Sequence, residues 1–273
     1  MVDNNKLSGT YTALVTPMNA DGSIDFGALD ALVEFQILAG IDGLVPCGTT
    51  GESATMTGQE RYEVIKRVVQ KAGGRVPVIA GAGSNATSVA IEHQKRAVDT
   101  GATCTLVVTP YYNKPTNEGL YRHYTALLEA ADIPIVLYNV PGRTGCDMKP
   151  GIVERLAKLD GIIAIKDATA DLTRVEQLRN STPGNFRLFS GDDSTACQFV
   201  LNGGDGVISV TSNVVPDLMS EMVRCARAGN TERAWAIHQQ LDDLMSTLFI
   251  ESNPIPIKTA LELQGRLKAH MRL

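Results

Sequence analysis

The sequence lacks the features that mark several large classes of protein. No apolar run approaches the ~18 residues that a membrane-spanning helix needs, and Met1–Lys6 contain no apolar stretch that could serve as a signal peptide. The cysteines number five, an odd count without a C-x-x-C pair, and the four histidines show no metal-ligand spacing. These absences argue against a membrane protein, a disulfide framework and a zinc site, and they predict a cytoplasmic protein with reduced, buried thiols.

Basic patches and aromatic residues are also scarce. The formal net charge is −5 and no run of lysine and arginine appears, which argues against nucleic acid and anionic membranes as partners. Aromatic residues make up 5% of the chain, so the core must be built from aliphatic side chains. Small anionic substrates are still compatible with this composition, because a local arginine binds a carboxylate whatever the overall charge.

What the sequence does have is a repeated pattern of short apolar runs separated by longer segments with helical periodicity. The runs are mostly continuous rather than alternating, which is typical of parallel strands covered on both faces. Eight runs follow one another: Tyr11–Val15, Gly43–Pro46, Val76–Ala80, Thr103–Val108, Ile133–Tyr138, Ile162–Lys166, Arg187–Ser190 and Gly206–Val210. Because their ends are spaced by the length of a βα unit, the sequence predicts an α/β protein with a closed (β/α)₈ TIM barrel.

After Ser212 the pattern changes to helix after helix. The segments are Pro216–Ala228, Thr231–Phe249 and Pro256–Gln264. The first completes the barrel and the others form a C-terminal appendage, so we expect a barrel domain over residues 1–228 and a helical region over residues 229–273. Earlier helix starts are predicted at Thr57, which opens a capping box with Glu60, and at Asp171.

One segment imitates a dinucleotide-binding motif. Gly81–Ala86 follows a predicted strand, opens a helix and fits the pattern G-x-G-x-x-G/A. That fingerprint normally lies in the first βα unit and is followed by an acidic residue at the end of the next strand, whereas the next strand here ends at Thr109. We expect instead a tight turn between strand and helix in the third barrel unit.

Lys166 is the most informative residue of the chain. It ends the apolar run Gly161–Lys166, and the carboxyl ends of the strands form the catalytic face of such a barrel. Burial there favours the neutral amine, which can attack a carbonyl and form a Schiff base. The alternative is a lysine whose ammonium extends past the strand end into water.

Polar residues also follow the second and fourth strands. Thr49 and Thr50 lie between glycines, where backbone N–H groups and hydroxyls could bind a carboxylate; a plain glycine-rich turn is the alternative. Tyr111 and Tyr112 would place phenol groups over the barrel mouth, or at a subunit contact.

The fifth strand supplies two further candidates. Tyr138 should point into the barrel one strand away from Lys166, where it could transfer protons during imine chemistry. Arg143 lies on a loop between glycines and could grip a carboxylate with both nitrogens, or form an ordinary surface ion pair.

Four segments carry a family pattern: Gly48–Glu52, Thr109–Asn113, Tyr138–Gly145 and Ile165–Ala168. Together they resemble the dihydrodipicolinate synthase (4-hydroxy-tetrahydrodipicolinate synthase) family of the N-acetylneuraminate lyase superfamily of class I aldolases. The resemblance runs from about Leu7 to Leu273. It implies a lyase of lysine (diaminopimelate) biosynthesis that condenses pyruvate with L-aspartate 4-semialdehyde and needs no metal or organic cofactor.

The resemblance also implies the catalytic roles. Lys166 would form the imine with pyruvate, and its enamine would attack the aldehyde of the second substrate. Tyr138, Thr49 and Tyr112 would form a proton relay, with Tyr112 supplied by the neighbouring subunit.

The implied substrate contacts involve further residues. Thr49 and Thr50 would hold the pyruvate carboxylate, and Arg143 would hold the carboxylate of the semialdehyde. Gly191 and Ile208 would line the pyruvate pocket.

Members of this family that are inhibited by lysine bind it at the dimer contact. The chain keeps four residues implied for that site: Ser53, Ala54, Asn85 and Tyr111. It has Gly58 and Arg61 where those members carry histidine, and Val89 where they carry glutamate. Because Val89 cannot pair the lysine ammonium and Arg61 would repel it, we expect weak or absent inhibition.

The resemblance implies a homo-oligomer, at least a tight dimer and commonly a tetramer built as a dimer of dimers. Relatives continue past the equivalent of Met271–Leu273 into one more helix, so the sequence predicts a shortened C-terminus, natural or trimmed. Two other functions stay open. One is a pyruvate-dependent aldolase acting on a keto-deoxy sugar acid, and the other is a non-catalytic barrel that binds a small molecule.

Overall fold

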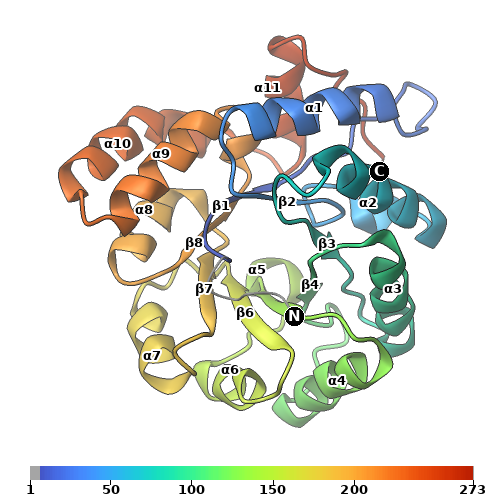
Figure 1. Ribbon diagram of the computed structural model, residues 1–273, viewed down its shortest axis with the longest axis vertical. Helices are drawn as coiled ribbons and strands as arrows, with labels where there is room; N and C mark the ends of the chain where they lie inside the picture. The colour runs from blue at the N-terminus through green and yellow to red at the C-terminus, as the bar shows by residue number, and fades with distance from the viewer. Residues whose placement is uncertain (1–6, 273) are drawn as a thin grey trace.

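The computed structural model describes residues 7–272 and contains eight parallel strands wound into a barrel inside a ring of helices (Figure 1). The strands are β1 Gly9–Ala13, β2 Gly43–Val45, β3 Ile79–Gly81, β4 Cys104–Val108, β5 Ile135–Asn139, β6 Ile162–Asp167, β7 Arg187–Ser190 and β8 Gly206–Ser209. Their order is β2-β1-β8-β7-β6-β5-β4-β3, and a parallel bridge from Leu44 to Val78 joins the two ends. The predicted (β/α)₈ barrel is therefore confirmed.

Several strand ends differ from the prediction for local reasons. The third strand begins at Ile79 rather than Val76, because Pro77 has no N–H to donate to the ladder. The first ends at Ala13 because the N–H of Val15 donates instead to Asn213 Oδ1 at 3.1 Å. The sixth continues one residue beyond Lys166.

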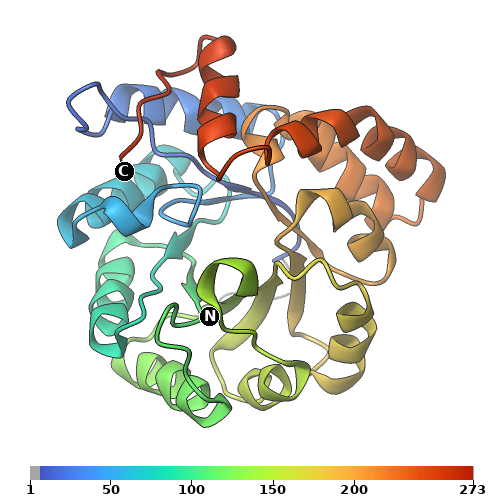
Figure 2. The same cartoon turned by 180° about the vertical axis from the view of Figure 1, so that it is seen from behind.

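Helices surround the barrel and extend beyond it at the C-terminal end of the chain (Figures 1 and 2). They are α1 Phe26–Leu38, α2 Gly58–Ala72, α3 Thr87–Thr100, α4 Asn117–Ala130, α5 Pro141–Thr144, α6 Pro150–Ala157, α7 Thr173–Ser181, α8 Asp193–Leu201, α9 Pro216–Arg227, α10 Thr231–Thr247 and α11 Ile255–Leu263, with 3₁₀ turns η2 Ser53–Thr55 and η3 Thr211–Asn213. None of the helices between residues 7 and 272 combines the length and apolar character needed to cross a bilayer. Met1–Lys6, where no signal peptide is predicted, lie outside the described residues.

The predicted helix starts have different outcomes. Thr57 and Glu60 form the expected capping box at the start of α2. The prediction for Asp171 is wrong in register, since α7 begins at Thr173 and its N-cap position is Leu172. Asp171 still contributes, because its Oδ1 accepts the Thr173 N–H at 3.1 Å.

Apolar residues divide into a cluster inside the barrel and clusters between strands and helices. The inner cluster includes Tyr11, Val136, Tyr138 and Ile208. The C-terminal helices share the outer clusters: residues of α10 pack with α8 and α9, and residues of α11 pack with α1 and α2. The domain division at residue 228 stays a prediction, but packing makes α10 and α11 continuous with the barrel.

The glycines of Gly81–Ala86 serve strand packing. A Cβ at residue 81 would lie 1.9 Å from the Cys47 carbonyl oxygen, and one at residue 83 would lie 2.6 Å from the Val108 nitrogen. Both glycines are therefore required where the backbone of a neighbouring segment approaches closely. This account agrees with a tight βα turn and leaves no need for a phosphate ligand.

Candidate active site

Lys166 lies on the inner face of β6, close to the carboxyl end of the barrel. Its side chain is 5% exposed, and its Nζ lies 4.6 Å from the centroid of the Tyr138 ring. Lys166 and Tyr138 are also register partners on the neighbouring strands β6 and β5. The structure thus brings these two predicted residues together, and the alternative of a lysine extended into water does not hold.

The structure contains a second buried lysine, Lys258, which sequence reasoning missed. It is 0% exposed, forms a short ion pair with Glu52 and donates to the His270 carbonyl at 2.7 Å. Burial lowers the pKa of Lys258, and the hydrogen bond with Glu52 opposes this effect. By contrast, the contact found for Lys166 Nζ within residues 7–272 is with the face of the Tyr138 ring, and no ion pair or hydrogen bond of Lys166 is found there. Of the two buried amines, Lys166 is the one left available for chemistry.

Space beside Lys166 comes from Gly191, the residue after β7. A Cβ there would lie 2.9 Å from Lys166 Cε, 3.1 Å from Lys166 Cγ and 2.7 Å from the Ala168 Cβ. The Gly191 N–H donates to the Asp167 carbonyl at 2.7 Å, so the backbone is fixed against the end of β6. Ile208, on β8, belongs to the inner apolar cluster with Tyr138. Gly191 therefore borders the lysine directly.

The turn after β2 carries Thr49 and Thr50. It is bounded by left-handed residues, Cys47 and Glu52, each with φ of 56°. A hydrogen bond from the Glu52 N–H to the Thr49 carbonyl, 3.0 Å long, closes the turn. Thr50 is buried, and its Oγ accepts a hydrogen bond from Asn253 Nδ2 at 2.9 Å. The turn is thus a fixed structure with a hydroxyl at its centre.

Asn253 is the main site residue absent from the predictions. It lies in the segment between α10 and α11 and is 8% exposed. Its carbonyl accepts a 3.3 Å hydrogen bond from Arg143 Nη2, while its side-chain nitrogen donates to Thr50. The sequence signal for this segment is the pair of prolines in Asn253-Pro254-Ile255-Pro256, which marks an unusual helix start. Asn253 therefore connects two of the predicted binding residues.

Arg143 lies on the short helix α5, which covers the carboxyl end of the barrel in Figure 2. The loop that follows is tied down by Asn139, whose Nδ2 donates to Asp147 Oδ1 and whose Oδ1 accepts the Met148 N–H, both at 2.9 Å. Burial opposes ionisation of Asp147, but hydrogen bonds from Lys149, Asn139 and the buried Arg174 lower its pKa to about 2. The segment that follows Arg143 is therefore anchored to the end of β5.

The tyrosines after β4 are exposed to solvent. Tyr112 is 89% exposed and has φ of 74°, and its N–H donates to the Thr144 carbonyl at 3.1 Å. Tyr111 is also exposed, and its carbonyl accepts from Asn85 Nδ2 at 3.2 Å. One chain therefore does not bring the Tyr112 phenol into its own site.

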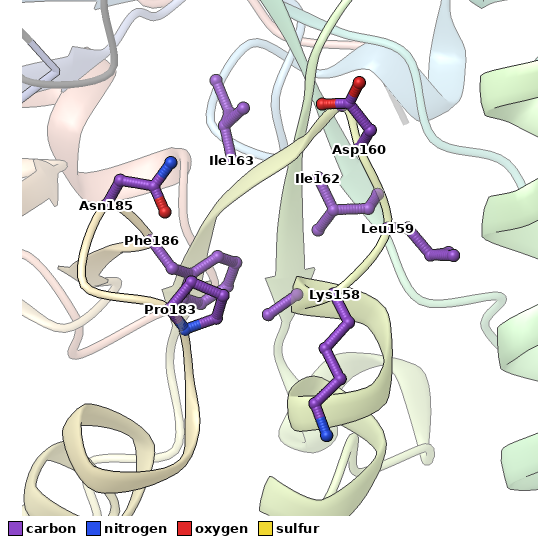
Figure 3. A pocket seen from close by; sticks show the side chains of 10 residues that line it. Lys158, Leu159, Asp160, Ile162, Ile163, Pro183, Asn185 and Phe186 are labelled. Atoms are coloured by element: carbon purple, nitrogen blue, oxygen red, sulfur yellow. The ribbon is translucent and has the colours of Figure 1, made fainter.

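A pocket of about 250 Å³ opens at the other end of the barrel, between the start of β6 and the segment leading into β7 (Figure 3). Its lining includes Gly161, Ile162, Pro183 and Phe186. The Lys158 ammonium at its edge pairs with Glu154 at 2.8 Å. The pocket lies at the N-terminal end of β6 and the candidate site at its C-terminal end, so we assign the chemistry to the Lys166 end.

No group of three or more His, Cys, Asp or Glu side chains within residues 7–272 is arranged to hold a metal ion. The carboxyl end of the barrel instead has Lys166 beside the Tyr138 phenol, and a chain of hydrogen bonds that joins the Thr50 hydroxyl, Asn253 and the Arg143 guanidinium. Such a set suits a small carbonyl compound with carboxylate groups.

A profile of the Dihydrodipicolinate synthetase family matches residues 6–273. The chain belongs to this family. The resemblance inferred from the four sequence segments is thereby confirmed over almost the whole chain.

Individual proteins of known sequence or structure are also similar to this chain over most of its length. The 4-hydroxy-tetrahydrodipicolinate synthase of Methylococcus capsulatus is 56% identical over 98% of this chain and 92% of its own length. The chloride-inhibited dihydrodipicolinate synthase of Acinetobacter baumannii, solved with pyruvate, is 46% identical with a TM-score of 0.96 over 98% of this chain and 92% of its own. A monomeric dihydrodipicolinate synthase variant is 41% identical with a TM-score of 0.96, covering 99% and 91%.

The positions implied for lysine binding in this family lie around the start of α2 and α3. Ser53 and Ala54 lie in η2, while Asn85 contacts Tyr111. Arg61 is buried, donates to the Gly81 carbonyl at 2.9 Å and lies with Nη1 3.4 Å from His93 Nε2. Burial first, and then the charge of Arg61, lower the pKa of His93 to about 4. The guanidinium of Arg61 is thus a fixed part of this region.

Proposed function

We propose that this chain condenses pyruvate with L-aspartate 4-semialdehyde to give 4-hydroxy-tetrahydrodipicolinate, using Lys166 as the imine-forming amine. The observation that carries the proposal is the buried Lys166 ammonium, which faces Tyr138 and has no carboxylate partner within residues 7–272. Family membership, the names of the sequence relatives and the pyruvate complex of a 46% identical structure support the same substrates. The chain is accordingly a lyase.

The reaction begins when Lys166 gives up a proton and its amine attacks the ketone carbon of pyruvate. Loss of water forms the imine, and loss of a methyl proton gives the enamine. The enamine carbon then attacks the aldehyde carbon, which forms the new C–C bond and places a proton on the resulting oxygen. The amino group of the second substrate finally displaces Lys166 and closes the ring.

Tyr138, Thr49 and Tyr112 act as the proton relay for these steps. Tyr138 is the member closest to Lys166 within one chain, and the exposed Tyr112 reaches a site only if a neighbouring subunit supplies it. We therefore infer at least a dimer. One structural relative is a monomeric variant, so the mass of the active protein in solution is the measurement that tests the dimer.

Carboxylate recognition is divided between two loops. Thr49 and Thr50 hold the carboxylate of pyruvate through hydroxyl and backbone donors, and Arg143 holds that of the semialdehyde. Gly191 and Ile208 border the pyruvate. The imine itself supplies the electron sink for enamine formation, so the proposed reaction requires no separate cofactor.

Inhibition by lysine is weak or absent in this proposal. Val89 offers no charge to the lysine ammonium, and Arg61 is a buried cation with a neutral histidine beside it. The positive charge of the Arg61 guanidinium would repel the ammonium groups of a lysine ligand.

Borohydride reduction tests the central step. With pyruvate present, the peptide that contains Lys166 should gain the mass of a reduced pyruvate adduct, and the peptide that contains Lys258 should not. Absence of an adduct in the folded enzyme would reject the proposal and favour a non-catalytic binding barrel. Faster turnover of keto-deoxy sugar acids than of aspartate 4-semialdehyde would keep the imine but reject the assigned second substrate.

A further inference from the structure

The segment between α10 and α11 reaches the carboxyl end of the barrel through Asn253. Asn253 Nδ2 donates to Thr50 Oγ at 2.9 Å, and the Asn253 carbonyl accepts from Arg143 Nη2 at 3.3 Å. Asn253 thus lies between the two residues to which the proposed function assigns different carboxylates. Its side chain is more than nine-tenths buried, so water does not readily compete for these contacts.

The direction of the Asn253–Thr50 hydrogen bond determines what the threonine can do. A hydroxyl has one proton to donate and two lone pairs that accept. Because the Asn253 amide donates to Thr50, one lone pair is occupied and the hydroxyl proton remains available. Within residues 7–272 that proton has no assigned acceptor. A carboxylate ligand would supply one.

The ion pair between Lys258 and Glu52 joins the segments that carry Asn253 and Thr50. Glu52 lies two residues after Thr50, and Lys258 lies on α11, which begins just after Asn253. The two form a buried short contact, and the Arg272 N–H donates to the other Glu52 oxygen at 2.9 Å. The pair therefore fixes the turn after β2 and the start of α11 relative to each other.

We propose that Asn253 is a positioning residue that makes the Thr50 hydroxyl a donor to the carboxylate of the keto acid. This inference rests on the proposed function and adds a residue to its substrate recognition. Asn253 acts through Thr50, so its loss should weaken binding of pyruvate more than it slows turnover at saturation. If Asn253 only filled space, Asn253→Ala should weaken pyruvate binding more than Asn253→Asp, which keeps the shape of the side chain.

The test compares Asn253→Asp with Asn253→Ala. Asp has nearly the same shape as Asn, but its carboxylate accepts the Thr50 proton and adds a negative charge beside the bound anion. We expect Asn253→Asp to raise the pyruvate concentration for half-maximal borohydride trapping at Lys166 by about tenfold or more, as for a lost hydrogen bond to a charged group. Asn253→Ala, which removes the contact without reversing it, should have the smaller effect.

A double-mutant cycle with Thr50→Val checks the connection. The cycle uses Asn253→Ala, because the charge of Asn253→Asp would also repel the bound anion directly. If Asn253 acts through the hydroxyl, Asn253→Ala should add little in the Thr50→Val background. Circular dichroism checks that each variant folds.

The outcomes separate the two proposals. An equal trapping midpoint for Asn253→Asp and the wild-type chain, a larger effect of alanine than of aspartate, or additive effects with Thr50→Val would each overturn the role of Asn253. Failure of the wild-type chain to form any adduct at Lys166 would instead overturn the proposed function itself.

Discussion

Lys166 Nζ lies 4.6 Å from the centroid of the Tyr138 ring, and the two residues are register partners on adjacent strands. This arrangement has two chemically separate parts. The face of the ring stabilises a cation, while the phenol oxygen can carry a proton. Substitutions can remove one part and keep the other.

Tyr138→Phe removes the hydroxyl and retains the ring over Lys166. We expect kcat to fall by ~10²–10⁴, the range typical of a lost general acid–base group, while the melting temperature changes little. Steady-state kinetics and thermal denaturation measure both. Tyr121→Phe is the matched control, because the Tyr121 ring packs on Arg155 outside the barrel. A decrease in kcat smaller than about threefold for Tyr138→Phe would remove it from the relay.

Gly191→Ala introduces a methyl group against Lys166 and Ala168. The closest approaches of 2.7 and 2.9 Å require a shift, and a displaced reacting amine is expected to reduce kcat/KM by about 10²-fold. Gly184→Ala is the control, since nothing lies within 4 Å of a Cβ at that position. Equal activities of the two variants would show that the space beside the lysine is not needed.

The exposed Tyr112 predicts complementation between subunits. Lys166→Ala and Tyr112→Phe should each be nearly inactive alone. After co-expression, a mixed dimer should contain one complete site, and random pairing should restore about a quarter of the wild-type activity. No recovery in a verified mixed dimer, or full wild-type activity at a monomeric mass by light scattering, would contradict a shared site.

Inhibition by lysine is expected only above about 1 mM, because the charge at Arg61 disfavours an ammonium ligand. Initial rates across a lysine titration, at saturating and at limiting pyruvate, give the measurement. Half-inhibition at lower concentrations would show that the remaining residues, such as Asn85 and Tyr111, are sufficient to bind it.

The Arg272–Glu60 pair predicts a pH-dependent contribution to stability. Hydrogen bonds from Arg272, and then from the Thr57 backbone, lower the pKa of Glu60 from 4.5 to about 2. A depressed pKa stabilises the folded state above pH 4.5, and the contribution is lost as the pH falls toward about 2. The difference in melting temperature between wild type and Arg272→Ala should therefore be largest near neutral pH and shrink through this range. In a Glu60→Gln background, which keeps an acceptor for the capping box, the effect of Arg272→Ala should not depend on pH over the same interval.

The sequence predicted the parts of the site that depend on strand ends. Lys166 and Tyr138 each close an apolar run, and a barrel brings the carboxyl ends of its strands together, so their proximity follows from pattern and topology. Small errors in strand bounds did not disturb this, because the inner face of each strand remained the same.

The contributions of the C-terminal segment could not be predicted in the same way. Asn253 and Lys258 contact the turn after β2 because α11 and the segment before it are held by an apolar cluster that α11 shares with α1 and α2, a tertiary arrangement without periodic signal in the sequence. Lys258 looks like an ordinary helix lysine until its burial against Glu52 is seen. Side-chain partners distant along the chain depend on tertiary packing, which local pattern does not specify.

Thr50 and Asn253 are separated by 203 positions along the chain. During synthesis, all eight strands leave the ribosome before the segment that carries Asn253. A nascent barrel would thus contain Lys166 and Tyr138 before the turn after β2 gains its contact with Asn253. With the role proposed for Asn253, the order of translation delays binding of the keto acid until the protein is nearly finished.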